Sequence, residues 1–187
     1  KMVTLTTALE DDVATADEVF ASPGTMDIGN APVSNFDKND YGNITLARAT
    51  ELSSNTVFGQ VGAELGSERL VEGADAFGFN HDIEFPLPLY TSLMPDPEDM
   101  TEWETAWAAA GEPVGENQTD NHPSPAGPQA TVLEMAMVGA GIANDGVIMQ
   151  PYLVDGVYNA NGERSLTAAP AKLLQATSPE TAQEVKG

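Results

Sequence analysis

Residues 45–66 read TLARATELSSNTVFGQVGAELG, and this stretch decides how the chain is organised. Apolar residues recur at helical spacing on both sides of the polar triplet Ser53-Ser54-Asn55. The two apolar rows are Leu46, Ala49 and Leu52 before the triplet, and Val57, Val61 and Leu65 after it. The sequence therefore predicts two helices joined by a short break whose side chains both donate and accept hydrogen bonds.

The triplet has two interpretations. In the first, a serine or asparagine caps the start of the second helix by accepting a backbone N–H, which contributes about 1 kcal/mol. In the second, Ser53 and Asn55 form a Ser-x-Asn element that takes part in acyl transfer. Three residues do not separate these interpretations, so the rest of the chain has to decide.

Composition narrows the possible partners. The chain has 187 residues, 7 basic against 29 acidic, and a net charge of −22. Such a chain repels nucleic acid phosphates and anionic lipid surfaces, so no nucleic acid partner is expected. The sequence has no cysteine, which excludes disulfides and thiolate metal sites. No run approaches the roughly 20 apolar residues of a membrane span.

An acidic, proline-rich excursion at about 81–129 interrupts the chain. Eight of the 13 prolines lie there, and they argue against regular structure. One short helix is predicted at 101–110, with Trp103 and Trp107 one turn apart. These two side chains either anchor the excursion on the core or form an aromatic platform for a ligand. His81 and His122 lack metal-ligand spacing, so neither a metal nor a cofactor is predicted.

The remaining segments give a mixed pattern. Helices are predicted at 1–10, at 67–77 and from Ser178-Pro179 onward, and short strands at 19–20 and 26–28. Residues 131–144 are the most apolar stretch, with Glu134 as the only charge, and predict a helix buried on several sides. Asn161-Gly162 predicts a β-hairpin turn.

Three blocks carry a resemblance to a known family. Residues 47–58, ARATELSSNTVF, resemble the Ser-x-Asn region of penicillin-binding protein transpeptidase domains. Residues 131–136 (TVLEMA), 143–147 (ANDGV) and 149–154 (MQPYLV) are similar to the family's Thr-Pro-Leu-Gln-Met-Ala … Ala-Asn-Gly-Gly … Met-x-Pro-Tyr-Leu-Val block, although Val132 and Glu134 replace its proline and glutamine. Residues 1–10 resemble the helix that follows Ser-x-x-Lys. The second block is most similar to the class B type of actinobacteria.

The resemblance implies an α+β fold of the penicillin-binding protein/serine β-lactamase type. Residues 1–187 would be a partial transpeptidase domain, mostly its helical subdomain with a few strands. Lys1 would be the lysine of Ser-x-x-Lys, Ser53 a proton relay, and Asn55 a hydrogen-bonding partner of substrate and lysine. The nucleophilic serine would precede Lys1 by three residues and the Lys-Thr-Gly motif would follow Gly187. We therefore expect an internal fragment that is inactive alone.

The implied function is part of a peptidoglycan D,D-transpeptidase that cross-links cell-wall stem peptides through a serine acyl-enzyme and binds penicillin. Expected partners are stem peptides, β-lactam antibiotics and proteins of cell division or elongation. The expected location is the extracytoplasmic face of the bacterial membrane, with the membrane anchor outside this chain. A non-catalytic cell-surface binding module is one alternative, and a D,D-carboxypeptidase or serine β-lactamase is the other.

Overall fold

The computed structural model describes residues 1–114 and 127–187, and in them helices dominate. The described helices are α1 (Met2–Glu10), α2 (Leu46–Leu52), α3 (Asn55–Ala76), α4 (Glu102–Ala110), α5 (Val132–Ala143) and α6 (Pro179–Lys186), with short 3-10 turns η1 (Phe36–Lys38) and η2 (Pro97–Asp99). The described strands are β1 (Val19–Ser22), β2 (Thr25–Ile28), β3 (Ala31–Ser34), β4 (Gly42–Thr45), β5 (Val147–Met149), β6 (Gly156–Tyr158), β7 (Arg164–Thr167) and β8 (Lys172–Gln175). The predicted α+β class is confirmed. The predicted position His122 and the middle of the acidic excursion lie outside the described residues.

The strands form antiparallel pairs rather than one large sheet. Within the described residues β1 pairs with β4, β2 with β3, β5 with β8, and β6 with β7. The β1–β4 register sets Val19 opposite Thr45, so β4 ends where α2 begins. Thr45 then caps α2 by accepting the backbone N–H of Arg48. A short ribbon therefore leads directly into the segment that carries Ser53 and Asn55.

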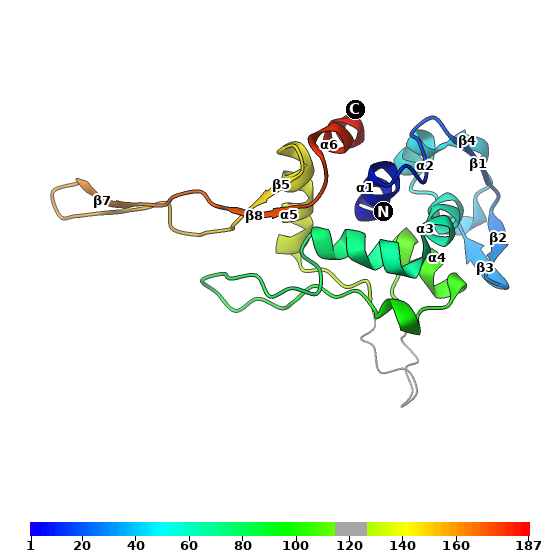
Figure 1. Cartoon of the computed structure of the whole chain (residues 1–187), viewed down its shortest axis with the longest axis horizontal. Helices are drawn as coiled ribbons and strands as arrows, with labels where there is room; N and C mark the ends of the chain where they lie inside the picture. The colour runs from blue at the N-terminus through cyan, green and yellow to red at the C-terminus, as the bar shows by residue number, and fades with distance from the viewer. Residues whose placement is uncertain (115–126) are drawn as a thin grey trace.

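The long helix α3 is two helices joined at Gly66. The backbone there has φ 76° and ψ 163°, which interrupts the helical geometry between the two halves. This region of conformational space is open almost only to glycine. The break falls where the sequence predicts one helix to end and the next to begin. Figure 1 shows the second half of α3 running beneath α1 toward α5.

Three apolar clusters make up the core of residues 1–114 and 127–187, and Trp107 of α4 packs against each of the three. One cluster surrounds α1, α2 and the first half of α3. A second surrounds the second half of α3 and α5, and a small third cluster packs the β2–β3 ribbon against α4. Trp103 packs on that third cluster and donates its indole N–H to the Pro32 carbonyl at 3.0 Å. Of the two interpretations of the tryptophan pair, the anchor is the one that these contacts support.

Helix α5 corrects one prediction from the sequence. The expectation of a helix buried on several sides is wrong for the described residues, because only one face is covered. Met137, Val138 and Ile142 are buried, whereas Val132 is 90% exposed and Met135 46% exposed. The buried residues recur at three- and four-residue spacing, as on a helix that packs through a single stripe.

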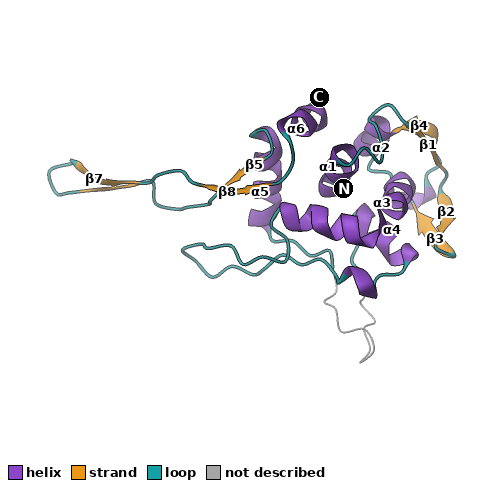
Figure 2. Cartoon of the chain, in the orientation of Figure 1, coloured by secondary structure: helices purple, strands orange, loops and turns teal. Residues whose placement is uncertain are grey.

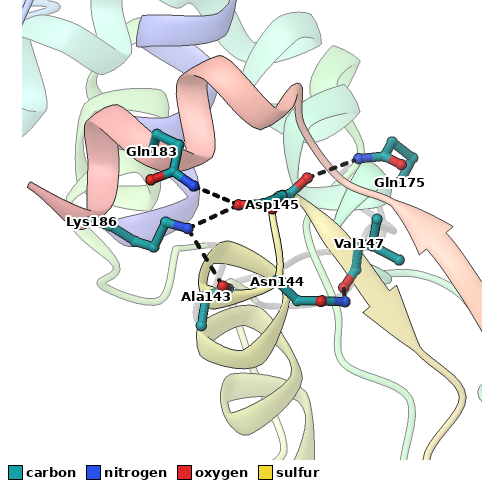
Figure 3. A network of polar contacts seen from close by, with 7 residues as sticks. All are labelled: Ala143, Asn144, Asp145, Val147, Gln175, Gln183 and Lys186. Carbon is teal, nitrogen blue, oxygen red and sulfur yellow. Dashed lines mark hydrogen bonds and ion pairs between the residues drawn. The ribbon is translucent and has the colours of Figure 1, made fainter.

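Two features hold the C-terminal helix α6 in place. Figure 3 shows Asp145, just after α5, facing Gln183 and Lys186 of α6. Its carboxylate accepts from Gln183 at 2.6 Å and from Lys186 at 2.9 Å. At the other end, the Glu10 carboxylate accepts from Thr177, from the Ser178 hydroxyl and from the Ser178 backbone N–H. Burial opposes the charge of Glu10, but hydrogen bonds from Thr181, Thr177 and Ser178 hold its pKa at about 2.

Beyond α5 the chain forms an extended arm. Figure 2 shows the β6–β7 ribbon projecting away from the helical body, with β5 and β8 at its base. The turn between β6 and β7 contains Asn161 and Gly162, as predicted. Several large apolar side chains along the arm are exposed, namely Tyr152, Leu153, Val154, Val157, Tyr158 and Leu166. None of the helices in the described residues is long and apolar enough to cross a membrane.

Candidate active site

The three residues of the polar triplet between α2 and α3 have different structural positions. Ser53 ends α2 in the left-handed conformation, with φ 54° and ψ 43°, and is exposed. Ser54 is fully buried and caps α3 by accepting the Val57 N–H at 3.3 Å. Asn55 is the first residue of α3. The capping interpretation is therefore correct for Ser54, and it leaves Ser53 and Asn55 available for a second role.

A buried polar network fixes this junction from outside the helix. Asn35, Ser22, Ser54 and Thr56 are all buried, and their polar atoms bond to one another. The Ser22 and Ser54 hydroxyls lie 2.8 Å apart. The Asn35 carboxamide oxygen accepts the Thr56 N–H at 3.0 Å and the Ser54 hydroxyl at 3.1 Å. Buried polar groups are tolerated when they are paired in this way, and the pairing rigidifies the site.

The side chain of Asn55 is oriented by the neighbouring ribbon. Its amide nitrogen donates to the Ser34 carbonyl at 3.0 Å. This bond uses the donor end of the carboxamide and leaves its oxygen free of that contact. Asn55 can therefore offer an acceptor to an ammonium group or an amide N–H.

Lys1 lies against the first half of α3 and the end of α4. Its amine donates to the Ala110 carbonyl at 2.6 Å and lies 6.0 Å from the ring centroid of Phe58. Phe58 follows Asn55 by one helical turn. Burial lowers the pKa of the Lys1 amine below its ordinary value, although the Glu112 carboxylate opposes this shift. A lowered pKa is what a lysine needs to act as a base near neutral pH.

Helix α1 is held to α4 by a second bond beside Lys1. The Thr4 hydroxyl donates to the Ala109 carbonyl at 2.8 Å. Together with the Lys1 bond, it satisfies two carbonyls at the C-terminus of α4, which have no partner within their own helix. The position of Lys1 therefore depends on where α4 ends.

A cavity of about 360 Å³ adjoins Lys1. Its lining includes Thr4, Leu70, Phe79, Met94 and Ala110, so it lies between α1, α3, α4 and the loop after α3. This space is large enough for part of a small ligand. No group of three or more His, Cys, Asp or Glu side chains is arranged to hold a metal ion in the described part of the chain.

A second cavity, of about 370 Å³, contains a buried carboxyl group. Glu134 lines it together with His81, Asp82, Tyr90 and Ser92. Glu134 is 2% exposed, and its Oε1 has no hydrogen-bond partner among the described residues. Burial raises the pKa of Glu134 to about 7, although a hydrogen bond from Ser92 opposes the shift. This carboxyl group is therefore close to half protonated near neutral pH.

The structure places the three predicted site residues in two places. Ser53 and Asn55 lie at the α2–α3 junction, and Lys1 lies against Phe58, one turn further along α3. The described hydrogen bond of the Lys1 amine goes to Ala110, and contact of Lys1 with Ser53 and Asn55 stays a prediction. Sequence reasoning missed Asn35, because its partners at the α2–α3 junction, Ser54 and Thr56, lie 19 and 21 residues away in the chain.

Comparison with known proteins gives consistent results. The family model described as the penicillin binding protein transpeptidase domain matches residues 1–187. The peptidoglycan D,D-transpeptidase PbpA of Mycolicibacterium smegmatis is 27% identical, with 97% of this chain and 35% of that protein covered. Penicillin-binding protein PbpB of the same organism is 26% identical, with 100% of this chain and 26% of that protein covered.

Two solved structures show the same arrangement of elements. A D,D-transpeptidase domain of a peptidoglycan glycosyltransferase from Eggerthella lenta has 67% identity and a TM-score of 0.95, over 99% of this chain and 45% of that one. Penicillin-binding protein A from M. tuberculosis, in an imipenem acyl-enzyme complex, has 25% identity and a TM-score of 0.79, over 98% of this chain and 40% of that one. The chain thus spans about a third or less of the curated relatives and under half of the solved chains.

Proposed function

This chain belongs to the penicillin binding protein transpeptidase domain family, and from this premise we propose that it forms part of a peptidoglycan D,D-transpeptidase. The proposed enzyme cross-links cell-wall stem peptides through a serine acyl-enzyme, and β-lactam antibiotics acylate the same serine. The M. smegmatis relative named as a D,D-transpeptidase supports this substrate class. The imipenem acyl-enzyme complex of the M. tuberculosis protein supports the β-lactam reaction.

The proposed reaction consists of two acyl transfers. A serine hydroxyl attacks the carbonyl carbon between two D-alanine residues, the C–N bond breaks, and D-alanine leaves with a proton. An amine of a second stem peptide then attacks the resulting ester and releases the serine hydroxyl. Each step moves one proton to and one proton from a reacting atom, so positioned bases and acids determine the rate.

In this proposal Lys1, Ser53 and Asn55 have different tasks. Lys1 takes the proton of the attacking serine, which its lowered pKa permits. The hydroxyl of Ser53 relays a proton toward the leaving amine. The carboxamide of Asn55 accepts a hydrogen bond from the substrate amide and helps to hold Lys1. The observation that most supports this assignment is the α2–α3 junction, which keeps Ser53 exposed while Ser54 is buried in the cap.

The nucleophile belongs to the same proposal. By the spacing of the family's Ser-x-x-Lys motif, the attacking serine precedes Lys1 by three residues. We therefore expect the 187 residues by themselves to form no penicillin adduct. Covalent labelling of the isolated chain by a fluorescent penicillin would contradict this expectation. The proposed place of action is the extracytoplasmic face of the bacterial membrane, where stem peptides are cross-linked.

The first experiment measures acylation of the full polypeptide that contains these residues together with the serine. We expect a fluorescent penicillin to label the wild-type protein, and Lys1→Ala to slow acylation by about 10²–10⁴-fold, the typical contribution of a general base. Ser53→Ala and Asn55→Ala should slow it as well. Lys172→Ala in β8 removes an exposed lysine from the arm and should leave the rate unchanged.

Two results would redirect the proposal. A wild-type polypeptide that no penicillin labels would favour a non-catalytic binding module. A labelled enzyme that releases its acyl group to water rather than to an added amine would favour a carboxypeptidase. The ratio of aminolysis to hydrolysis, measured by chromatography of the peptide products, separates these cases.

A further inference from the structure

We infer that Asn35 is a positioning residue for the acyl-transfer site, because its buried carboxamide fixes the first turn of α3 and thereby the placement of Ser53 and Asn55. The inference rests on the function proposed above. Asn35 lies directly after β3 and is 4% exposed. It comes 18 residues before Ser53 in the sequence, outside all three blocks that carry the family resemblance.

The oxygen of the Asn35 carboxamide serves the start of α3. It accepts the backbone N–H of Thr56 at 3.0 Å and the hydroxyl of Ser54 at 3.1 Å. The N–H groups in the first turn of a helix have no carbonyl partner within that helix. The Ser54 hydroxyl accepts the N–H of Val57 from within the same segment. Asn35 accepts the N–H of Thr56 from outside the helix. The helix therefore begins where the carboxamide holds it.

The nitrogen of the same carboxamide is tied to the ribbons. It donates to the Pro23 carbonyl at 3.1 Å, to the Asn39 carbonyl at 3.0 Å and to the Ser22 hydroxyl at 3.3 Å. The nitrogen of the carboxamide thus bonds to the segments that follow β1 and η1, and its oxygen bonds to the start of α3. Because both ends are engaged and the group is buried, the junction cannot shift without breaking several bonds.

The preceding residue completes the arrangement. The Ser34 carbonyl accepts from the Asn55 amide nitrogen at 3.0 Å. Residues 34 and 35 therefore hold both the side chain of Asn55 and the backbone N–H of the residue after it. Ser53 precedes the buried Ser54 by one residue and is already confined to a left-handed backbone conformation. A shift of the first turn of α3 would displace both groups together.

Only a neutral group with a donor end and an acceptor end fits this site. Alanine at position 35 would leave the Thr56 N–H and two carbonyls without partners. An aspartate would keep the acceptor but set a negative charge against the Pro23 and Asn39 carbonyl oxygens. Protonation would return one donor to that aspartate, because a neutral carboxyl group has one O–H.

The first test compares Asn35→Ala with a matched control in the full polypeptide that carries the serine. The readouts are the second-order rate constant for acylation by a fluorescent penicillin and the melting temperature, with rates measured well below melting. We expect Asn35→Ala to reduce the rate constant by about 10- to 100-fold, as expected when reacting groups are misplaced by around 1 Å. Asn80→Ala is the control, because Asn80 bonds to Met94 and Asp75 near the other end of α3. It should lower the melting temperature and leave the rate constant unchanged.

The second test uses Asn35→Asp and pH. We expect the ratio of variant to wild-type rate constants to rise as pH falls from about 8 to about 5, because a buried carboxyl group protonates in that range. Taking the ratio removes the pH dependence that both proteins share through Lys1. A purely structural asparagine would change the melting temperature with pH and leave this ratio flat. Asn35→Asp also serves if Asn35→Ala does not fold.

The outcomes are distinct. A lower melting temperature with an unchanged rate constant for Asn35→Ala, or a flat ratio for Asn35→Asp, overturns the positioning role. If the wild-type polypeptide is not acylated at all, the proposed function itself fails.

Discussion

Glu134 stands where the family block usually has glutamine, and the difference has a physical consequence. A glutamine is neutral at every pH, whereas this carboxyl group titrates with a pKa of about 7. Its Oε1, which has no hydrogen-bond partner in the described parts of the chain, faces Gly78, where even a methyl group would approach it to 3.0 Å. The charged form is therefore the unfavourable one in the folded protein.

Glu134→Gln should stabilise the protein in a pH-dependent way. The pKa of Glu134 is 4.5 in the unfolded protein and about 7 in the folded protein, so the carboxyl group loses its proton at a lower pH when the protein is unfolded. The stability of the wild-type protein consequently falls as pH rises from about 4.5 to about 7 and then levels off. We expect the melting temperature of Glu134→Gln to exceed that of the wild type at about pH 8, and the gain to shrink toward about pH 5.

The matched control for that measurement is Glu64→Gln. It removes the same charge from an exposed position on α3. A difference between wild type and Glu134→Gln that stays constant across the pH range would show that Glu134 does not titrate between the two states.

At the residue scale the sequence predicted what depends on neighbouring positions. The capping role of Ser54 follows from the Ser53-Ser54-Asn55 triplet and is confirmed, whereas the catalytic roles of Ser53 and Asn55 stay predictions. Asn35 could not be found in this way, because its role depends on a ribbon folding back onto α3. The burial that lowers the pKa of Lys1 likewise comes from long-range packing, including the end of α4.

The interruption in α3 shows how one residue sets the geometry of an element. Gly66 has a positive φ of 76°, and a side chain added there would meet no atom within 4 Å. Any cost of substitution must therefore come from the backbone conformation rather than from a clash. The interruption divides the half of α3 that carries Asn55 from the half that packs with α5.

Gly66→Ala should destabilise the protein by about 1–3 kcal/mol, the usual cost of holding a side-chain-bearing residue in such a conformation. Gly139→Ala is the opposite control, because Gly139 lies inside α5 with open space around it. Alanine there should stabilise the helix by up to about 1 kcal/mol. Urea denaturation of the two variants measures both changes, and equal effects would refute the assignment of strain to Gly66.

Elements whose ends are marked by turn-forming or helix-capping residues were predicted well from the sequence. The Asn161-Gly162 turn and the helix opened by Ser178-Pro179 both formed where expected. The prediction that α5 is buried on several sides was wrong, because apolar residues alone do not determine which faces of a helix pack against other elements. Val132 and Met135 have the apolar character of core residues, yet both lie on the uncovered face.

At the level of the whole molecule, Trp107 links the three apolar clusters. Its side chain packs against the cluster around α1, the cluster around α5 and the small cluster beneath the β2–β3 ribbon. Helix α4 thereby connects the part of the protein that holds Lys1 with the part that holds α5. Loss of this side chain would open a void where all three clusters meet.

Trp107 is partly buried, so Trp107→Ala should reduce the free energy of unfolding by about 2–3 kcal/mol, somewhat below the cost of truncating a fully buried aromatic. Trp103→Ala makes the same truncation at a residue that, among the described residues, packs on the small cluster and on neither of the two larger ones. Its effect should be clearly smaller, although it also loses the bond to Pro32. Chemical denaturation of both variants provides the comparison, and equal losses would refute the linking role of Trp107.

The β6–β7 ribbon offers a practical use. Its turn at 159–162 is exposed and projects away from the helices in Figure 1. Exposed turns of this kind are, with chain termini, the places where a fold best tolerates added sequence. A fluorescent-protein fusion or an affinity epitope could be spliced in at this point, so that the protein could be followed in living cells without disturbing the distant groups around α3.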